Sequence, residues 1–154
     1  MSERRHGFLE DYLPYLLRRA DQALSAGFYR TLNDYGVARS EWRVLAVLAD
    51  LGELSMLDLT AASLSPQPTV THAVRRLEQR DLVRRVAGTH DKRQRFVSIT
   101  ASGRTLTKAL IAEAKQLEAE CLAGAGDLTE LVDQLRRLTE LVESAAQEAA
   151  SEAG

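Results

Sequence analysis

The stretch SPQPTVTHAVRRLEQRDLVRRVAGTHDKRQR, residues 65–95, decides how this chain is interpreted. Val70, Val74 and Leu77 recur at the helical spacing that places apolar residues on one buried stripe. At about 100° per residue, another set of side chains points away from that stripe. This outward set comprises Thr69, Thr71, His72, Arg75, Arg76 and Gln79. We predict a short helix with an apolar inner face and a polar, basic outer face.

An arginine-rich hairpin is expected to follow this helix. Residues 82–86 and 96–100 alternate enough to form two strands, and the polar segment 87–93 connects them. A two-stranded hairpin is marginal by itself, so this one should lean on the preceding helices. Asp81 stands where the chain must turn sharply, in a left-handed conformation that Asp tolerates less well than Gly.

The charge distribution is more informative than the net charge of −2. Residues 75–95 contain eight Lys and Arg against three Asp and Glu, whereas residues 96–154 contain five against ten. A local basic block on an acidic chain attracts phosphates at one face and repels them elsewhere. The alternative interpretation is a solvated surface whose charges cluster by chance.

Composition excludes several classes of protein. A length of 154 residues fits one domain, or a small domain with an appendage. No apolar run is long enough to span a membrane and no signal-peptide pattern opens the chain, so we expect a cytoplasmic protein without membrane contact. The single cysteine, Cys121, excludes an internal disulfide, and we expect it to be buried. His6, His72 and His90 lack metal-ligand spacing, so no metal is expected.

Catalytic motifs are also missing from the sequence. There is no nucleophile paired with a base, no Gly-rich phosphate loop and no carboxylate couple in an apolar context. We therefore expect neither an enzyme nor a bound cofactor.

Helical patterns fill the first part of the chain. A long helix should extend from about residue 8 to 35 and stop at Gly36, and Pro14 within it should kink it or break it early. Ser40 is expected to cap a second helix that continues through 43–51 and is closed by Gly52. A short third helix, capped by Ser55, should carry its apolar stripe on Leu57, Ala61 and Leu64.

Two long helices, 101–122 and about 127–150, are expected to end the chain, the first capped by Thr100 or Ser102 and the second by Asp127. Apolar residues of the last helix recur at spacings of three and four and form a seam, a pattern that predicts packing against another helix. This seam consists of Leu128, Leu131, Leu135, Leu138 and Val142, and a less regular one on the preceding helix consists of Leu106, Leu110, Leu117 and Leu122. Two interpretations remain open: a bundle within one chain, or a homodimer made from both chain ends, which we favour.

The motifs SEWRVLAVL (40–48), SPQPTVTHAVRRLEQRDLVRR (65–85) and HDKRQRFVSITASGR (90–104) together resemble the MarR family of bacterial transcriptional regulators. The resemblance covers nearly the whole chain and is most specific in the wing, where Asp91-x-Arg93 precedes a strand, Thr100 and Gly103. Two positions depart from the family: Asp81 stands where Gly is usual, and Gln94 follows Arg93 where a second Arg is frequent.

The resemblance implies a mainly α fold with a small antiparallel β-wing, that is, a winged helix-turn-helix. It divides the chain into an N-terminal dimerisation helix (1–36), a DNA-binding domain (37–100) and C-terminal dimerisation helices (101–154). It also implies a repressor that binds a pseudo-palindromic operator on double-stranded DNA as a homodimer.

The outer face of the predicted helix and the hairpin supply the residues for this binding. An α-helix fits the major groove, where arginine pairs with guanine and small polar side chains meet base edges. For base edges the candidates are Thr69, Thr71, His72, Arg75 and Arg76, and for phosphates Ser65, Gln67, Arg84 and Lys92. Pro68 and Arg95 belong to the same candidate surface. The resemblance places Arg93 in a narrow minor groove and gives Asp91 the role of orienting nearby arginines.

Two further interpretations complete the predictions. Family members often bind small aromatic or phenolic acids, and Tyr12, Tyr15, Arg18, Trp42 and Arg43 could line such a site; equally, the rings could pack a junction of the core. The rival to DNA binding is a winged-helix module whose basic face binds an acidic partner protein.

Overall fold

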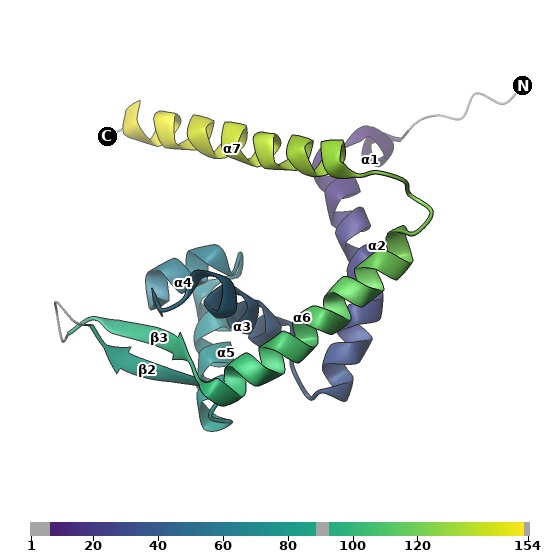
Figure 1. Ribbon diagram of the computed structural model, residues 1–154. Coiled ribbons are helices and arrows are strands. Elements are labelled where there is room, and N and C mark those ends of the chain that lie inside the picture. Colours follow the sequence, from purple (N-terminus) through teal and green to yellow (C-terminus); the bar gives the residue numbers. More distant parts are fainter. Residues whose placement is uncertain (1–6, 89–92, 153–154) are drawn as a thin grey trace, which may run out of the picture. The chain divides into compact units, whose positions relative to one another are not determined.

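The computed structural model describes residues 7–88 and 93–152, and helices make up most of them (Figure 1). The first part contains α1 (Phe8–Asp11), α2 (Leu13–Asp34), α3 (Arg39–Leu51), β1 (Leu54–Ser55), α4 (Met56–Ala62) and α5 (Gln67–Gln79). The hairpin β2 (Val83–Ala87) and β3 (Arg95–Ile99) follows, and then α6 (Ala101–Leu122) and α7 (Thr129–Glu152). Contacts divide the chain into two compact units, residues 1–118 and 119–154. The expected fold class, mainly α with a small antiparallel wing, is confirmed.

Proline and glycine end helices where the sequence predicts. Pro14 lies in the first turn of α2, and Tyr12, which is extended at ψ 104°, separates α1 from α2. The long first helix is therefore broken early rather than kinked. Gly36 (φ 64°) and Gly52 (φ 81°) follow α2 and α3 in a conformation that side chains with a Cβ rarely adopt.

The cap of α3 differs from the prediction. The helix begins at Arg39, one residue before Ser40, so Ser40 is not its N-cap. The Glu41 carboxylate instead accepts a hydrogen bond from the backbone N–H of Ala38 at 2.9 Å. Since a carboxylate three residues into a helix can reach back to the cap, Ala38 needs no polar side chain of its own. The predicted cap at Ser55 is confirmed, because its hydroxyl accepts from the Asp58 N–H at 3.1 Å.

The predicted inner stripe of α4 was wrong. Leu57 and Leu64 are 79% and 85% exposed, and Ala61 is exposed too. Leu59 is instead fully buried. In a helix of only seven residues, two overlapping stripes of apolar residues are possible. Packing against the rest of the protein buries the stripe that contains Leu59.

The sheet has three strands in the order β1-β3-β2, one more than expected. Leu54 pairs with Val97, and Ser55 pairs with Phe96, so β3 is the central strand. A strand of two residues is too short to show an alternating pattern, so no pattern in the sequence predicts β1. The hairpin thus rests on the helical part through β1, as its marginal stability requires.

Two apolar clusters hold the first unit together. One lies among α3, α4, α5 and the sheet and is formed by Val44, Leu45, Leu48, Leu59, Val70, Ala73, Val74, Leu77, Leu82, Val83, Val97 and Ile99. The other joins α2 to α6 through Phe28, Leu32, Val37 and Leu110. The α6 seam therefore packs within the chain at Leu110, with Leu106 and Leu117 against the same cluster.

A dense junction connects α5, the hairpin and α6. Asp81 has φ 55°, which confirms the left-handed turn expected there. The Thr100 hydroxyl donates to the Asp81 carbonyl at 2.7 Å and accepts from the Gly103 N–H at 3.0 Å, so Thr100 rather than Ser102 caps α6. Gly103 is buried against the Leu82 carbonyl.

The second unit contains the end of α6 and the whole of α7. Asp127 accepts from the N–H of Thr129, the first residue of α7, at 2.9 Å, and so stands one residue before the N-cap position predicted for it. Hydrogen bonds from the Thr129 hydroxyl and from this backbone N–H lower the pKa of the Asp127 carboxyl. Cys121 is exposed, so the expectation that it is buried was wrong. The apolar side chains of α6 that pack on the second cluster end at Leu117, one turn before Cys121.

Candidate nucleic-acid interface

The exposed face of α5 is the first part of the candidate interface. Val70, Val74 and Leu77 are buried, with Ala73 beside them, so the inward stripe is confirmed. On the other side, a shallow hollow of about 430 Å³ is lined by Gln67, Pro68, Thr71, His72 and Arg75. This group, which we call the reading face, therefore gathers five of the predicted DNA-binding residues on one surface. Thr69 is exposed on the same helix but lies outside the hollow.

The β2–β3 hairpin carries the second group of basic side chains and projects away from the helices of the first unit (Figure 1). Arg84, Arg93 and Arg95 are exposed. Arg85 is held by an ion pair to Glu78 of α5, with 3.5 Å between Nε and Oε2. Asp91 and Lys92 lie outside the described residues. The described part of the hairpin thus carries four exposed arginines, one of which, Arg85, is paired with α5.

Ser65 occupies the turn between α4 and α5. Its hydroxyl donates to the Ser63 carbonyl at 3.1 Å and accepts from Arg43 Nη1 at 3.2 Å. Leu64, just before it, has φ 50°, a left-handed conformation in which a side chain is strained. The start of the reading face is therefore tied directly to α3.

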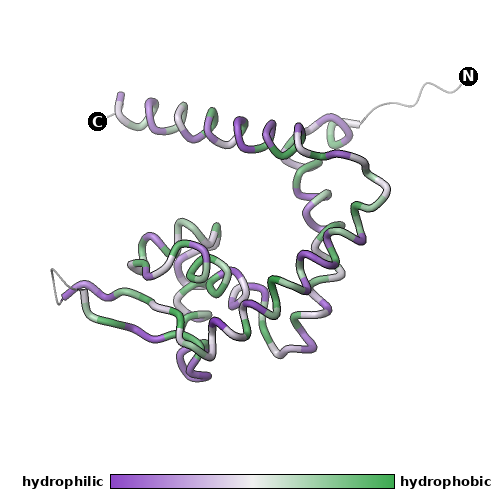
Figure 2. Tube along the Cα trace, viewed as in Figure 1, coloured by the Kyte–Doolittle hydropathy of each residue, from purple (hydrophilic) through white to green (hydrophobic). Residues whose placement is uncertain are grey.

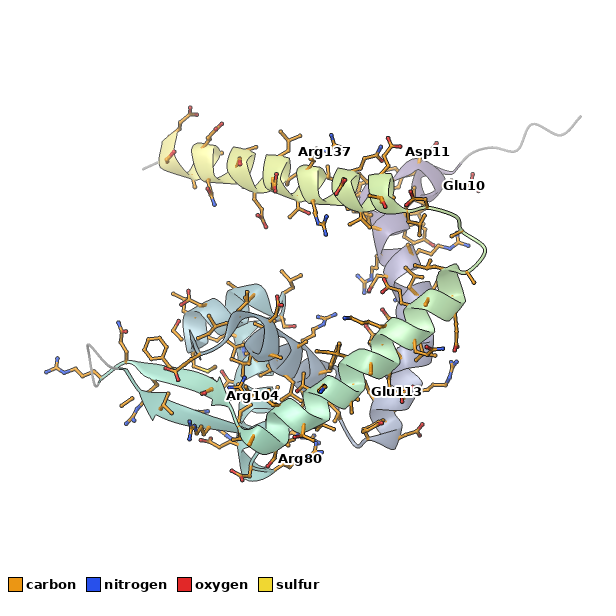
Figure 3. The ribbon with its side chains drawn as sticks, in the orientation of Figure 1. Glu10, Asp11, Arg80, Arg104, Glu113 and Arg137 are labelled. Carbon is orange, nitrogen blue, oxygen red and sulfur yellow. The ribbon has the colours of Figure 1, made fainter. Side chains whose placement is uncertain are left out.

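An ionic cluster missed by the sequence analysis joins α3 to α5. Glu41 is fully buried, and its Oε1 lies 2.8 Å from Nε of Arg76. Its Oε2 accepts from the Ala38 N–H and lies 3.5 Å from Nη1 of Arg80, at the C-terminal end of α5 (Figure 3). Arg80 also donates to the Gly36 carbonyl at 2.8 Å. No local pattern in the sequence indicated this cluster, because Glu41 and its two arginines are far apart along the chain.

The five candidate ligand-binding residues are not brought together. Trp42 and Arg43 line one pocket of about 380 Å³, between α2, α3 and the end of α4. Trp42 also contacts Phe28 edge-to-face at 4.9 Å and borders a second pocket of about 300 Å³. Tyr12, Tyr15 and Arg18 line neither pocket, and all three are exposed on the N-terminal helices. Trp42 thus both packs against the core and borders open space.

Four of the predicted dimerisation residues are on α7 and the fifth, Leu128, directly precedes it; α7 has no buried residue in the described chain. Figure 2 shows hydrophobic and hydrophilic residues alternating along this helix. Leu131, Leu135 and Val142 are 48%, 37% and 58% exposed, while Leu128 and Leu138 are half-buried. An apolar stripe of this size on one helix is a surface that another helix can cover.

In the part of the chain that the structure describes, no group of three or more His, Cys, Asp or Glu could hold a metal ion. No helix within the described ranges is both long and apolar enough to cross a membrane.

The order of elements and the basic helix-plus-wing surface define a winged helix-turn-helix protein. Residues 35–94 match the model of the MarR family. The chain is 34% identical in sequence to the MarR family transcriptional regulator SPO1453 of Silicibacter pomeroyi. The two structures superpose with a TM-score of 0.77, over 88% of this chain and 98% of SPO1453. This chain belongs to the MarR family.

Other relatives are also regulators. The transcriptional repressor NicR of Pseudomonas putida is 30% identical over 133 residues, 85% of this chain and 84% of NicR. The match to the regulator FarR of Neisseria gonorrhoeae is shorter: it is 31% identical and spans 58% of this chain and 62% of FarR. BpsR of Bordetella bronchiseptica, whose DNA binding is regulated by 6-hydroxynicotinic acid, is 28% identical with a TM-score of 0.72 over 89% of this chain and 96% of BpsR.

Proposed function

We propose that this protein is a transcriptional repressor that binds a pseudo-palindromic operator as a homodimer. The observation that carries the proposal is the reading face of α5 with the arginine-rich hairpin beside it. A helix of this kind enters the major groove, where Arg75 would pair with guanine and Thr71 or His72 would meet base edges. Gln67 and Arg84 would hold phosphates and so set the register.

The hairpin would extend the contact beyond the major groove. Arg93 is exposed near the tip of the hairpin, where its guanidinium would enter a narrow minor groove. Arg95 and Lys92 would add phosphate contacts, and Asp91 would orient the arginines around it. These four roles remain proposals that rest on the family resemblance and on the charge of the segment.

Dimerisation is supported by the uncovered apolar stripe of α7. A second copy of the chain would cover it and place a second reading face about one duplex turn, roughly 34 Å, from the first. The operator would then contain two matching half-sites.

Substitutions separate the two kinds of DNA contact. Arg93→Ala is expected to weaken binding to every sequence, because one positive charge near the phosphates is lost. It should also reduce the salt slope, that is, the steepness with which log affinity falls against log salt concentration, by about one. Arg75→Ala or His72→Ala is expected to relax discrimination between half-sites, at a cost of about 1–3 kcal/mol for Arg75. Gel-shift titrations over a range of salt concentrations measure both quantities. The reverse pattern would show that the groove assignment is wrong.

We also propose that a hydroxylated aromatic acid binds beside Trp42 and releases the DNA. The pocket that Trp42 shares with Arg43 also contains the buried hydroxyl of Ser63, which has no hydrogen-bond partner among the described residues. A ligand carboxylate at Arg43 would compete with the Arg43–Ser65 hydrogen bond and so disturb the start of α5. The regulation of BpsR by 6-hydroxynicotinic acid supports this class of ligand.

The effector proposal has a direct optical test. Trp42 is the only tryptophan, so its fluorescence should change when 6-hydroxynicotinic acid or a related hydroxylated aromatic acid binds. Arg43→Gln should weaken this response about tenfold or more, since a charge-assisted hydrogen bond is lost. Lys115→Gln, in the neighbouring pocket, is the matched control. If Lys115→Gln weakens binding and Arg43→Gln does not, the ligand occupies the other pocket.

A further inference from the structure

We infer that Glu41 is a specificity-determining residue that keeps Arg76 and Arg80 away from DNA. The inference rests on the proposed DNA-binding function and goes beyond it. Arg75 and Arg76 are adjacent, basic and exposed, so the sequence alone makes them equivalent candidates for DNA contact. The structure separates them, because Arg75 lines the reading face and Arg76 turns back to Glu41.

The burial of Glu41 explains why Arg76 stays there. The Glu41 side chain is 0% exposed, whereas that of Arg76 is 53% exposed. A buried carboxylate without a cation is strongly unfavourable. The attraction between an arginine and a phosphate at the protein surface is weaker, because water and salt screen it. Moving Arg76 to a phosphate would leave only Arg80, whose nitrogen is 3.5 Å from Oε2. Glu41 Oε1 accepts no well-formed hydrogen bond among the described residues, so the Arg76 charge is its main compensation.

The arrangement favours selectivity over general affinity. Arginines that reach phosphates strengthen binding to every sequence, whereas those that reach base edges strengthen binding to one. By holding Arg76 of α5 at 2.8 Å and Arg80, which directly follows α5, at 3.5 Å, Glu41 limits the sequence-independent attraction of the recognition helix. The same contacts tie α5 to the start of α3 and so orient the reading face.

Glu41→Gln is the informative substitution. The glutamine carbonyl can still accept from the Ala38 N–H and so preserve the cap of α3. The amide NH₂, however, would face the Arg76 guanidinium as donor against donor and release it. We expect the salt slope of DNA binding to steepen by about 0.9 for each released arginine that reaches a phosphate. The same substitution loosens the tie between α5 and α3 that orients the reading face, so the scrambled duplex should gain more affinity than the selected one, and the ratio of the two affinities should fall about tenfold.

Four control variants isolate the cause. Glu113→Gln removes the same charge from an exposed position of α6 and should leave the salt slope unchanged. Adding Arg76→Gln and Arg80→Gln to Glu41→Gln should return the slope to the wild-type value. In the wild-type background, Arg76→Gln alone should not change the slope, whereas Arg84→Gln should reduce it by about 0.9.

The probe is a duplex that the wild-type protein selects from random-sequence DNA, compared with a scrambled duplex of equal composition. The inference is overturned if Glu41→Gln leaves both slope and affinity ratio unchanged, or if Arg76→Gln lowers the slope as Arg84→Gln does. The Arg76→Gln comparison decides the question even if Glu41→Gln does not fold. Absence of any sequence preference in the wild-type protein would instead overturn the proposed function, and this inference with it.

Discussion

Gly103→Ala is expected to lower the free energy of unfolding by about 3 kcal/mol, at the upper end of the usual cost of overpacking. A Cβ at this position would overlap the Leu82 carbonyl oxygen, and would lie 2.8 Å from Ile99 Cγ1 and 3.0 Å from the Leu82 carbonyl carbon. The overlapping atoms belong mostly to backbone, which cannot rotate away as a side chain can. The start of α6 would have to separate from the chain segment that follows α5.

The consequence should extend beyond stability. The Gly103 N–H donates to the Thr100 hydroxyl, which itself donates to the Asp81 carbonyl at 2.7 Å. Displacing α6 breaks these two hydrogen bonds and disturbs the turn between α5 and the hairpin. Urea unfolding followed by circular dichroism measures the loss. Gly124→Ala is the matched control, because a Cβ there meets nothing within 4 Å. Equal stabilities of the two variants would show that the Gly103 junction is not tightly packed.

The pair Leu131→Asp and Leu135→Asp is expected to convert a dimer into a monomer and to weaken operator binding by about 10²–10⁴-fold. Two half-sites bound by one dimer gain an affinity of that order over a single half-site. Both leucines are exposed, at 48% and 37%, so their replacement should not unfold the chain. Light scattering gives the mass in solution, and a titration with the selected duplex gives the affinity.

A second pair of substitutions controls for the added negative charge. Ser144→Asp and Gln147→Asp place the same two carboxylates on the opposite side of α7, where both residues are exposed. This variant should remain dimeric and bind as the wild-type protein does. A dimeric Leu131→Asp/Leu135→Asp variant with unchanged affinity would contradict the role proposed for the α7 stripe.

Most of the fold could be predicted because its signals are local. The stripe Val70, Val74 and Leu77 predicted α5, and glycines after α2 and α3 predicted their ends. Asp81 was predicted in the left-handed conformation from its place between a helix and a strand, and its φ is 55°. Each of these features depends on residues within a few positions of one another.

The features that were missed depend on distant partners. The two residues of β1 become a strand only because they pair with Val97 and Phe96. Glu41 meets Arg76 and Arg80 across 35 and 39 positions of sequence, which no periodicity reveals. Within α4, the buried residue is Leu59, and the choice between it and Leu57 is made by the neighbouring helices.

The candidate interface was predicted in part for the same reason. Helical periodicity placed Thr71, His72 and Arg75 on one outward face, and Gln67 and Pro68, which were assigned to the DNA-binding surface separately, line the same hollow. Arg76 was grouped with them because helical geometry places it nearby, although its partner is on α3. The roles of all these residues toward DNA remain predictions.

We propose that the reading face of α5 and the hairpin bind duplex DNA in a sequence-dependent way. The most direct measurement is the affinity of the wild-type protein for a duplex it selects from random-sequence DNA and for a scrambled duplex, at several salt concentrations. We predict that the selected duplex is bound about 10³-fold or more tightly and contains two matching half-sites. Equal affinity for both duplexes, with retention on heparin, would contradict the claim and favour a basic face that binds an acidic protein partner.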